Sequence, residues 1–362
     1  MSLSRNLSKR VSSIIRVIKF YIQNPFLCYC FERQKRLIRL CLFNASARYC
    51  GSGRVLRMSY FDVKDPICET EDCPKHISVE LIPRTVDLGG FQVGRVLPSK
   101  EKRTVGPFVF WDQAGPSELL TGKGIDVRPH PHIGLSTMTY LFSGRLEHRD
   151  TLGSHQIIVP GEVNLMTAGR GIAHSERTPQ PDRFYPQHFF GIQCWLALPL
   201  NKEETNPSFN HYDKSAIPMD NDNNISFWVI VGEWMGLRSS VITQNDALFV
   251  ECKLQAQAEL IIPSTLEERA IHLLSGKITI DNVSYDATRM LVLKPGAELK
   301  VMADSAVHMI ILGGAALEER RYLWWNFVSS SRERIEQAKL DWKEGKFGKI
   351  PGDEKEFIPL PD

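Results

Sequence analysis

The feature that most constrains how this 362-residue chain can fold is a pair of β-rich stretches. Residues 78–200 read as short strands separated by turn signals, without helical periodicity of any length. A second β-rich stretch covers residues 225–316, where LLSGKITI at 273–280 echoes LFSGRLEH at 141–148. A Pro-Gly turn follows each segment. This weak self-similarity predicts an all-β protein made of a duplicated barrel.

The segments outside these stretches differ in kind. Residues 201–224 are rich in Asn, Asp and Pro, which suits a linker. Residues 317–362 contain a helical pattern that begins at the serines of 329–331, which are N-cap candidates, and a glycine and a proline end it. We expect one amphipathic helix followed by an extended tail, both packed on the barrels. The large apolar residues expected to pack this segment are Trp324, Trp325 and Trp342.

Charge is distributed unevenly along the chain. The formal net charge is +2, yet residues 1–57 hold 12 Lys or Arg and a single acid, Glu32. The remainder carries 32 basic and 41 acidic residues, so the body gives no case for direct nucleic-acid binding. The apolar run from Val11 to Cys30 is too interrupted for a transmembrane helix, and a secretory cleavage site is not evident. We expect this leader to be disordered or dispensable, with Met58 beginning the body; organelle targeting or a membrane-surface role is the alternative.

The eight cysteines are spread thinly, and none forms a CxxC pair. In a chain of this length, such usage is typical of reduced thiols rather than of a disulfide framework. We therefore expect a cytoplasmic protein, and a monomer.

Two short segments carry the side chains that suit a metal site. The first is RPHPHIG at 128–134, where His130 and His132 lie two positions apart. The second, TAGRGIAHSERT at 167–178, repeats this spacing with His174 and Glu176. Residues two apart in a strand point to the same face, so each pair aims its ligands at one point. Taken alone, either pair also suits a solvated turn.

Together, the two pairs predict one transition metal ion per chain, bound by His130, His132, His174 and Glu176. Three imidazoles and a carboxylate suit iron, and also manganese, nickel, copper or zinc. Four protein ligands in an octahedron leave two adjacent positions open, as in non-haem iron oxygenases, where dioxygen and substrate both reach the metal.

These motifs resemble those of the pirin family, in the cupin superfamily. The resemblance covers about residues 78–362 and rests on RPHPHIG with the following TYLFSG, and on the more specific MTAGRGIAHSE at 166–176. A third segment, YLWWNFVSSS at 322–331, is typical of microbial members. General cupins have another Glu shortly after the His pair, where this chain has Ser136 and Thr137. Pirins move the carboxylate to the second motif, so the departure is expected.

The resemblance implies two cupin barrels face to face, a bicupin. It places a metal, usually iron, in the N-terminal barrel, and we expect none in the C-terminal barrel. The ligands implied are the four residues already named.

It also implies two classes of function. Some members cleave the flavonol quercetin with dioxygen, and others are redox-responsive cofactors of transcription factors or other proteins. We favour an Fe(II) dioxygenase of the quercetin 2,3-dioxygenase type, because open coordination positions are present in either case, and Glu176 would serve as its catalytic base. The alternative is a metal-dependent regulatory module that modulates a transcription factor or a metabolic enzyme.

For the remaining candidate residues, the sequence gives less specific expectations. Residues 108–112 are expected either to line the mouth of the pocket or to pack in the core. His272 and His308 lack paired partners in the sequence, so we expect structural roles. Three further histidines near the motifs are expected at the surface: His148, His155 and His188.

Overall fold

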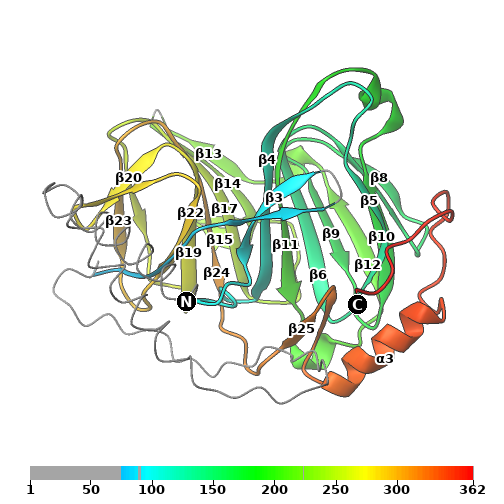
Figure 1. Ribbon diagram of the computed structural model, residues 1–362. Coiled ribbons are helices and arrows are strands. Elements are labelled where there is room, and N and C mark those ends of the chain that lie inside the picture. Colours follow the sequence, from blue (N-terminus) through cyan, green and yellow to red (C-terminus); the bar gives the residue numbers. More distant parts are fainter. Residues whose placement is uncertain (1–74, 89–90, 223, 362) are drawn as a thin grey trace, which may run out of the picture. The chain divides into compact units, whose positions relative to one another are not determined.

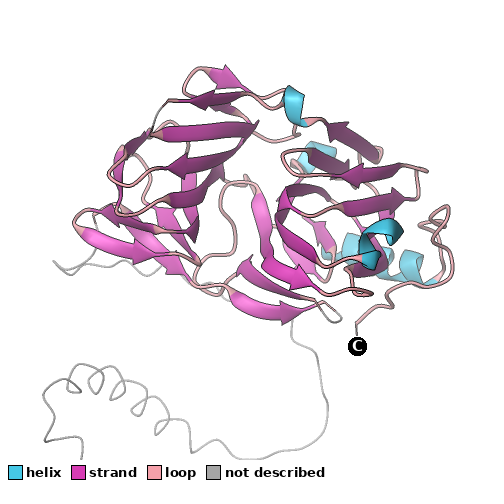
Figure 2. Ribbon diagram, turned by 90° about the horizontal axis from the view of Figure 1, so that it is seen from above, coloured by secondary structure: helices cyan, strands magenta, loops and turns pink. Residues whose placement is uncertain are grey.

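The computed structural model describes residues 75–88, 91–222 and 224–361, so the expectations for residues 1–57 lie outside the described residues. Strands dominate (Figures 1 and 2), which confirms the all-β class. Every described residue belongs to one compact unit. Within it, no helix combines the length and apolar character needed to cross a membrane.

The N-terminal barrel contains two antiparallel sheets. The larger has the order β12 (Ser208–Tyr212), β9 (Val163–Thr167), β6 (Leu135–Ser143), β11 (Gln187–Ala197), β4 (Phe108–Leu119), β3 (Gln92–Leu97) and β2 (Arg84–Asp87). The smaller has the order β5 (Asp126–His132), β10 (Ile172–Arg177), β7 (Leu146–Asp150) and β8 (His155–Ile158).

The C-terminal barrel repeats this architecture. Its larger sheet has the order β1 (Ile77–Leu81), β22 (Arg289–Leu293), β19 (Glu268–Ser275), β24 (Val307–Gly314), β17 (Ala247–Leu254), β14 (Ile225–Val231) and β13 (Met219–Asn221). Its smaller sheet has the order β18 (Glu259–Ile262), β23 (Leu299–Ala303), β20 (Lys277–Ile280) and β21 (Val283–Asp286). Two-stranded ribbons are formed by β15 (Glu233–Trp234) with β16 (Leu237–Arg238), and by β25 (Tyr322–Trp324) with β26 (Phe327–Ser329).

The self-similar segments occupy equivalent places in the two barrels. Each joins the end of a long strand to a short one, β6 to β7 and β19 to β20. The turn glycines Gly144 and Gly276 have φ values of 86° and 85°, a left-handed conformation that glycine adopts without steric cost. A Cβ at Gly276 would lie 2.2 Å from the Ala306 carbonyl oxygen, so this position has no room for a side chain.

The chain exchanges strands at the boundaries of the barrels. β1 falls almost entirely in the range expected for the N-terminal barrel, residues 78–200, yet it pairs with β22 of the C-terminal one. Ile77 and Leu81 of β1 are buried there. The segment expected to be a linker supplies β12 to one barrel and β13 to the other. Short strands in an Asn- and Asp-rich segment have little intrinsic β-propensity, so pairing decides their conformation.

The two larger sheets pack face to face through a shared core. Trp111 of β4 donates from Nε1 to His272 Nδ1 at 2.9 Å, and the Tyr140 hydroxyl donates to Glu251 Oε2 at 2.6 Å. His308 Nε2 lies 2.9 Å from the other oxygen of Glu251. His272 and His308 therefore have structural partners, as expected.

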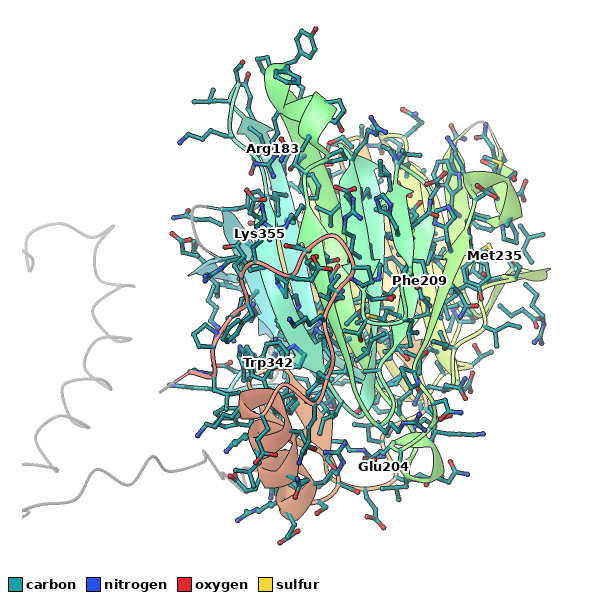
Figure 3. The ribbon with its side chains drawn as sticks, turned by 90° about the vertical axis from the view of Figure 1, so that its right-hand side faces the viewer. Arg183, Glu204, Phe209, Met235, Trp342 and Lys355 are labelled. Atoms are coloured by element: carbon teal, nitrogen blue, oxygen red, sulfur yellow. The ribbon has the colours of Figure 1, made fainter. Side chains whose placement is uncertain are left out.

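The C-terminal segment forms the expected helix. α3 (Arg332–Lys343) begins after Ser331, whose hydroxyl accepts the Arg334 N–H at 3.2 Å. This is the N-cap that the run of serines predicted. Ile335 and Ala338 are its buried residues. Trp342 at its end donates from Nε1 to the Ile358 carbonyl at 3.0 Å and so holds the extended tail. Figure 3 shows Trp342 and, farther along the tail, Lys355.

Candidate metal centre

Three histidines converge inside the N-terminal barrel. His130 and His132 point inward from β5, and the antiparallel register with β10 places His174 opposite His130. One nitrogen from each ring lies within 4.8 Å of the others. The spacing of two residues in the first motif and the register of β5 with β10 therefore bring together the three imidazoles that the sequence predicted as ligands. All three are buried.

The hydrogen bonds of the rings leave suitable nitrogens facing one another. His130 Nδ1 lies 2.8 Å from the Arg128 carbonyl oxygen, so Nδ1 carries the proton and Nε2 has a free lone pair. The Nε2 atoms of His132 and His174 are 3.1 Å apart. Two nitrogens bound at right angles to one ion at about 2.1 Å would lie about 3.0 Å apart. The rings thus fit a shared transition metal.

Burial keeps these imidazoles neutral, which is the form that binds metals. It lowers the pKa of His130 to about 4. Burial together with neighbouring histidines holds the pKa values of His132 and His174 well below the ordinary range.

Glu176 lines the same cavity but does not belong to the cluster of histidine nitrogens. Its oxygens are not among the atoms that cluster within 4.8 Å. They are held instead by Gln193 Nε2, at 3.3 Å from each oxygen, and the Thr139 hydroxyl lies 3.2 Å from Oε1. A shift in register between His174 and Glu176 accompanies this displacement. Burial raises the pKa of Glu176, although the neighbouring His148 and these hydrogen bonds oppose the rise.

The sequence prediction for His148 is wrong. This histidine is only 4% exposed, because Leu146, His148 and Asp150 alternate inward along β7. Its Nδ1 lies 3.3 Å from His174 Nδ1. The alternation with Leu146 was the signal that could have located it. His155 and His188 are exposed, as expected.

A cavity of about 510 Å³ opens beside the histidines. One wall is layered: the Arg95 guanidinium lies 4.4 Å from the Phe110 ring centre, and Phe110 stacks on Trp195 at 3.8 Å. Trp195 in turn meets the edge of His132 at 5.1 Å. Asp112 anchors Arg95 through two hydrogen bonds of 2.8 and 2.7 Å. Of residues 108–112, Phe110 and Asp112 therefore line the pocket, whereas Trp111 packs in the core. A volume of this size and an aromatic lining are typical of small-molecule sites.

The C-terminal segment completes the cavity wall. An isolated bridge joins Ile133 to Phe327, which brings the β25–β26 ribbon next to His132. Farther on, the Ile358 N–H donates to the Pro129 carbonyl at 2.8 Å. The lining residues from this segment are Leu323, Trp325, Asn326 and Ile358.

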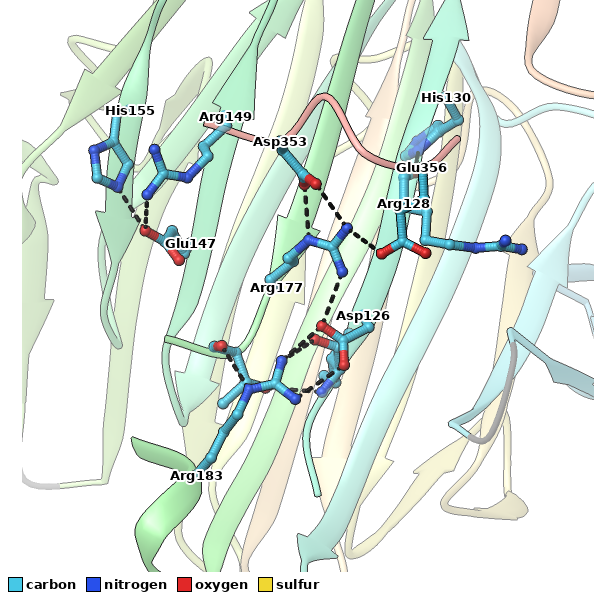
Figure 4. A network of polar contacts seen from close by, with 12 residues as sticks. Asp126, Arg128, His130, Glu147, Arg149, His155, Arg177, Arg183, Asp353 and Glu356 are labelled. Carbon is cyan, nitrogen blue, oxygen red and sulfur yellow. Dashed lines mark hydrogen bonds and ion pairs between the residues drawn. The ribbon is translucent and has the colours of Figure 1, made fainter. Parts of the chain in front are cut away.

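Charged side chains fasten the tail across β5 and β10. Arg177, next to Glu176 in sequence, donates to Asp353 at 2.7 and 2.9 Å and to Glu356 at 2.8 Å. It also reaches Asp126 at 3.1 Å, which Arg183 contacts as well. Figure 4 shows Arg177 at the centre of this network. These bonds raise the pKa of Arg177 above its already high ordinary value.

Comparison with known proteins gives consistent matches. The model for Pirin matches residues 90–196, and that for the Pirin C-terminal cupin domain matches residues 249–348. A pirin-like protein of Caulobacter vibrioides is 44% identical over 77% of this chain and 97% of its own length. A Pseudomonas aeruginosa protein, whose name proposes quercetin 2,3-dioxygenase activity, is 32% identical over 81% and 94%.

Among solved structures, a quercetin 2,3-dioxygenase from Acinetobacter baumannii superimposes with a TM-score of 0.73. It is 33% identical, and the match covers 78% of this chain and 95% of that one. The expected arrangement of two cupin domains is confirmed by these matches.

Proposed function

Because the chain belongs to the pirin family, we propose that it is a metal-dependent dioxygenase that opens the ring of flavonols such as quercetin. One observation carries the proposal: three neutral imidazoles converge at an aromatic cavity that also holds a buried carboxylate. The similarity to a quercetin 2,3-dioxygenase supports the choice of substrate class.

We propose iron(II) as the metal, with His130, His132 and His174 as ligands and Glu176 as the fourth. The cavity holds the Glu176 carboxylate near the histidines, and its hydrogen-bond partners Thr139 and Gln193 are neutral. When bound, the metal supplies Lewis acidity and a route for electrons between substrate and dioxygen.

The chain's own groups bind and orient the substrate. Phe110 and Trp195 line the cavity and give a planar flavonol an apolar wall to pack against. The tail residues Trp325 and Ile358 also line the cavity and help to exclude water from it.

Glu176 accepts the proton of the flavonol hydroxyl group. A carboxylate within hydrogen-bonding reach of the substrate hydroxyl is a suitable general base. Gln193 donates to both of its oxygens and so keeps them directed into the cavity. In the reaction, one dioxygen molecule adds across the heterocyclic ring. The ring opens to an ester that contains both oxygen atoms, and one ring carbon leaves as carbon monoxide.

The test is oxygen uptake with quercetin by iron-loaded protein, with carbon monoxide release as a second readout. We expect both for the parent and neither for metal-stripped protein or for the double variant His130→Ala, His174→Ala. The double variant His155→Ala, His188→Ala changes two exposed histidines and should keep the parent rate.

If the iron-loaded parent consumes no oxygen with several flavonols, the dioxygenase proposal is wrong. The redox-responsive binding module would then be the better account. Capture of protein partners by ferrous and by ferric protein would be compared next.

A further inference from the structure

His148 and Asp150, on the neighbouring strand β7, form a chain of hydrogen bonds with His174. His148 Nε2 lies 2.9 Å from Asp150 Oδ2, and His148 Nδ1 lies 3.3 Å from His174 Nδ1. The other oxygen of Asp150, Oδ1, accepts the backbone N–H groups of Leu152 at 2.9 Å and Ser154 at 3.0 Å. Asp150 is fully buried.

The geometry assigns a direction to this chain of hydrogen bonds. An ionised carboxylate only accepts, so His148 Nε2 carries the proton and donates to Asp150. The Nδ1 of a neutral His148 is then an acceptor, and His174 Nδ1–H donates to it. This leaves the lone pair of His174 on Nε2, the atom 3.1 Å from His132 Nε2. The reverse direction would place a proton on His174 Nε2, where it would block a metal.

The surrounding strands fix the positions of His148 and Asp150, which we call the dyad. Cross-strand pairing sets Asp150 opposite His174 and His148 opposite Glu176. The His148 ring also stacks on Phe209 of β12, with centres 4.3 Å apart and planes 15° apart. Phe209 is labelled in Figure 3. The ring of His148 therefore has one orientation, set by packing on one side and by Asp150 at its end.

We propose that His148 and Asp150 are positioning residues that fix the tautomer and orientation of His174 and tune the metal it binds. The inference rests on the metal site of the proposed function. By accepting the Nδ1–H of His174, the dyad makes its Nε2 a stronger electron donor. A stronger donor binds the metal more tightly and favours the ferric over the ferrous ion.

Asp150→Asn is the most informative variant, because it preserves the shape of the side chain but reverses the direction of its hydrogen bond with His148. The two backbone N–H groups require an acceptor, so the amide oxygen faces them and the amide NH₂ faces His148. His148 must then accept at Nε2 and carry its proton on Nδ1, opposite the Nδ1–H of His174. His148→Phe is the second variant; it keeps the stack on Phe209 and removes both bonds.

The first readout is affinity for cobalt(II), titrated by visible absorption. We expect both variants to bind about 10- to 100-fold more weakly than the parent. Glu147→Gln is the matched control, because it neutralises a carboxylate of the same strand that pairs with Arg149 and His155. It should bind cobalt(II) as the parent does.

The second readout is the reduction potential of the iron-loaded protein. Losing the acceptor should weaken ferric binding more than ferrous binding, and each tenfold difference raises the potential by about 59 mV. Unchanged affinity and potential in Asp150→Asn would overturn the proposal. An equal loss for both ions, at constant potential, would also overturn it by showing a merely structural role. A parent that binds no metal would instead defeat the proposed function itself.

Discussion

Glu176 has two proposed roles, metal ligand and proton acceptor, and a single atom change separates them. A glutamine at this position keeps the shape and an oxygen for the metal, but it cannot take up a proton. The hydrogen bonds that Glu176 accepts from Thr139 and Gln193 hold its side chain in the cavity.

Glu176→Gln should therefore lose far more rate than metal. A lost general base typically costs about 100- to 10,000-fold in rate. Three imidazoles remain to bind the metal, so the iron content should fall less. The measurement is oxygen uptake with quercetin, with each rate divided by bound iron. Equal normalised rates for variant and parent would show that Glu176 is only a ligand.

The pair formed by His130 and His132 could be predicted from sequence, because residues two apart in a strand point to the same face. His148 was missed because it has no paired ligand in the sequence, and its alternation with the apolar Leu146 was the signal for an inward-facing position. Thr139 and Gln193 contact Glu176 only because β6 and β11 are neighbours in the sheet. Pairing between distant strands has no local signature in a single sequence.

At the scale of elements, the C-terminal tail, residues 350–361, is bonded to β10 through Arg177 and lines the cavity through Ile358; we call it the strap. The helix α3 was predictable from its caps and helix formers. The path of residues 350–361 was not predictable, because Arg177 is 176 residues from Asp353 and 179 residues from Glu356 in the sequence.

Arg177→Gln should loosen this strap. Ion pairs near the protein surface contribute about 0.2–1 kcal/mol each, and the pair with Asp353 is partly buried. Losing the pairs to Asp353 and Glu356 should therefore make the tail open about tenfold more often. Hydrogen exchange of the Ile358 amide, which is bonded to the Pro129 carbonyl, reports this opening.

Arg183→Gln is the control for the strap. Arg183 shares the partner Asp126 with Arg177, but its other hydrogen bonds go to the carbonyls of Ile125 and Thr178 rather than to the tail. Equal exchange rates in the two variants would show that Arg177 does not hold the tail.

At the scale of the whole described unit, the two barrels are joined through buried polar contacts as well as apolar ones. The duplication was visible in the sequence, because the Ser-Gly turns recur at matching places. The Trp111–His272 bond that spans the barrels was not, since neither residue stands in a motif.

The burial of His272 at this contact predicts that the free energy of unfolding depends on pH. Burial lowers the pKa of His272 to about 3, against about 6.5 in an unfolded chain. Between these values the unfolded chain binds one more proton at this position. The free energy of unfolding should therefore fall by up to about 1.4 kcal/mol per pH unit as the pH drops from 6.5 towards 3.

His272→Gln removes this titration and leaves the other buried histidines in place. Denaturant unfolding between pH 4 and 6.5 should give a shallower pH dependence for the variant than for the parent, by about one proton. Parallel curves for the two proteins would mean that His272 is not held neutral in the folded state.

Metal content per chain bears most directly on the site formed by His130, His132 and His174. Elemental analysis of the purified parent should give about one transition metal ion per chain. The variant His130→Ala, His174→Ala should contain almost none, while His155→Ala, His188→Ala should match the parent. If the His130→Ala, His174→Ala variant keeps the parent's metal content, the metal does not lie at the three histidines.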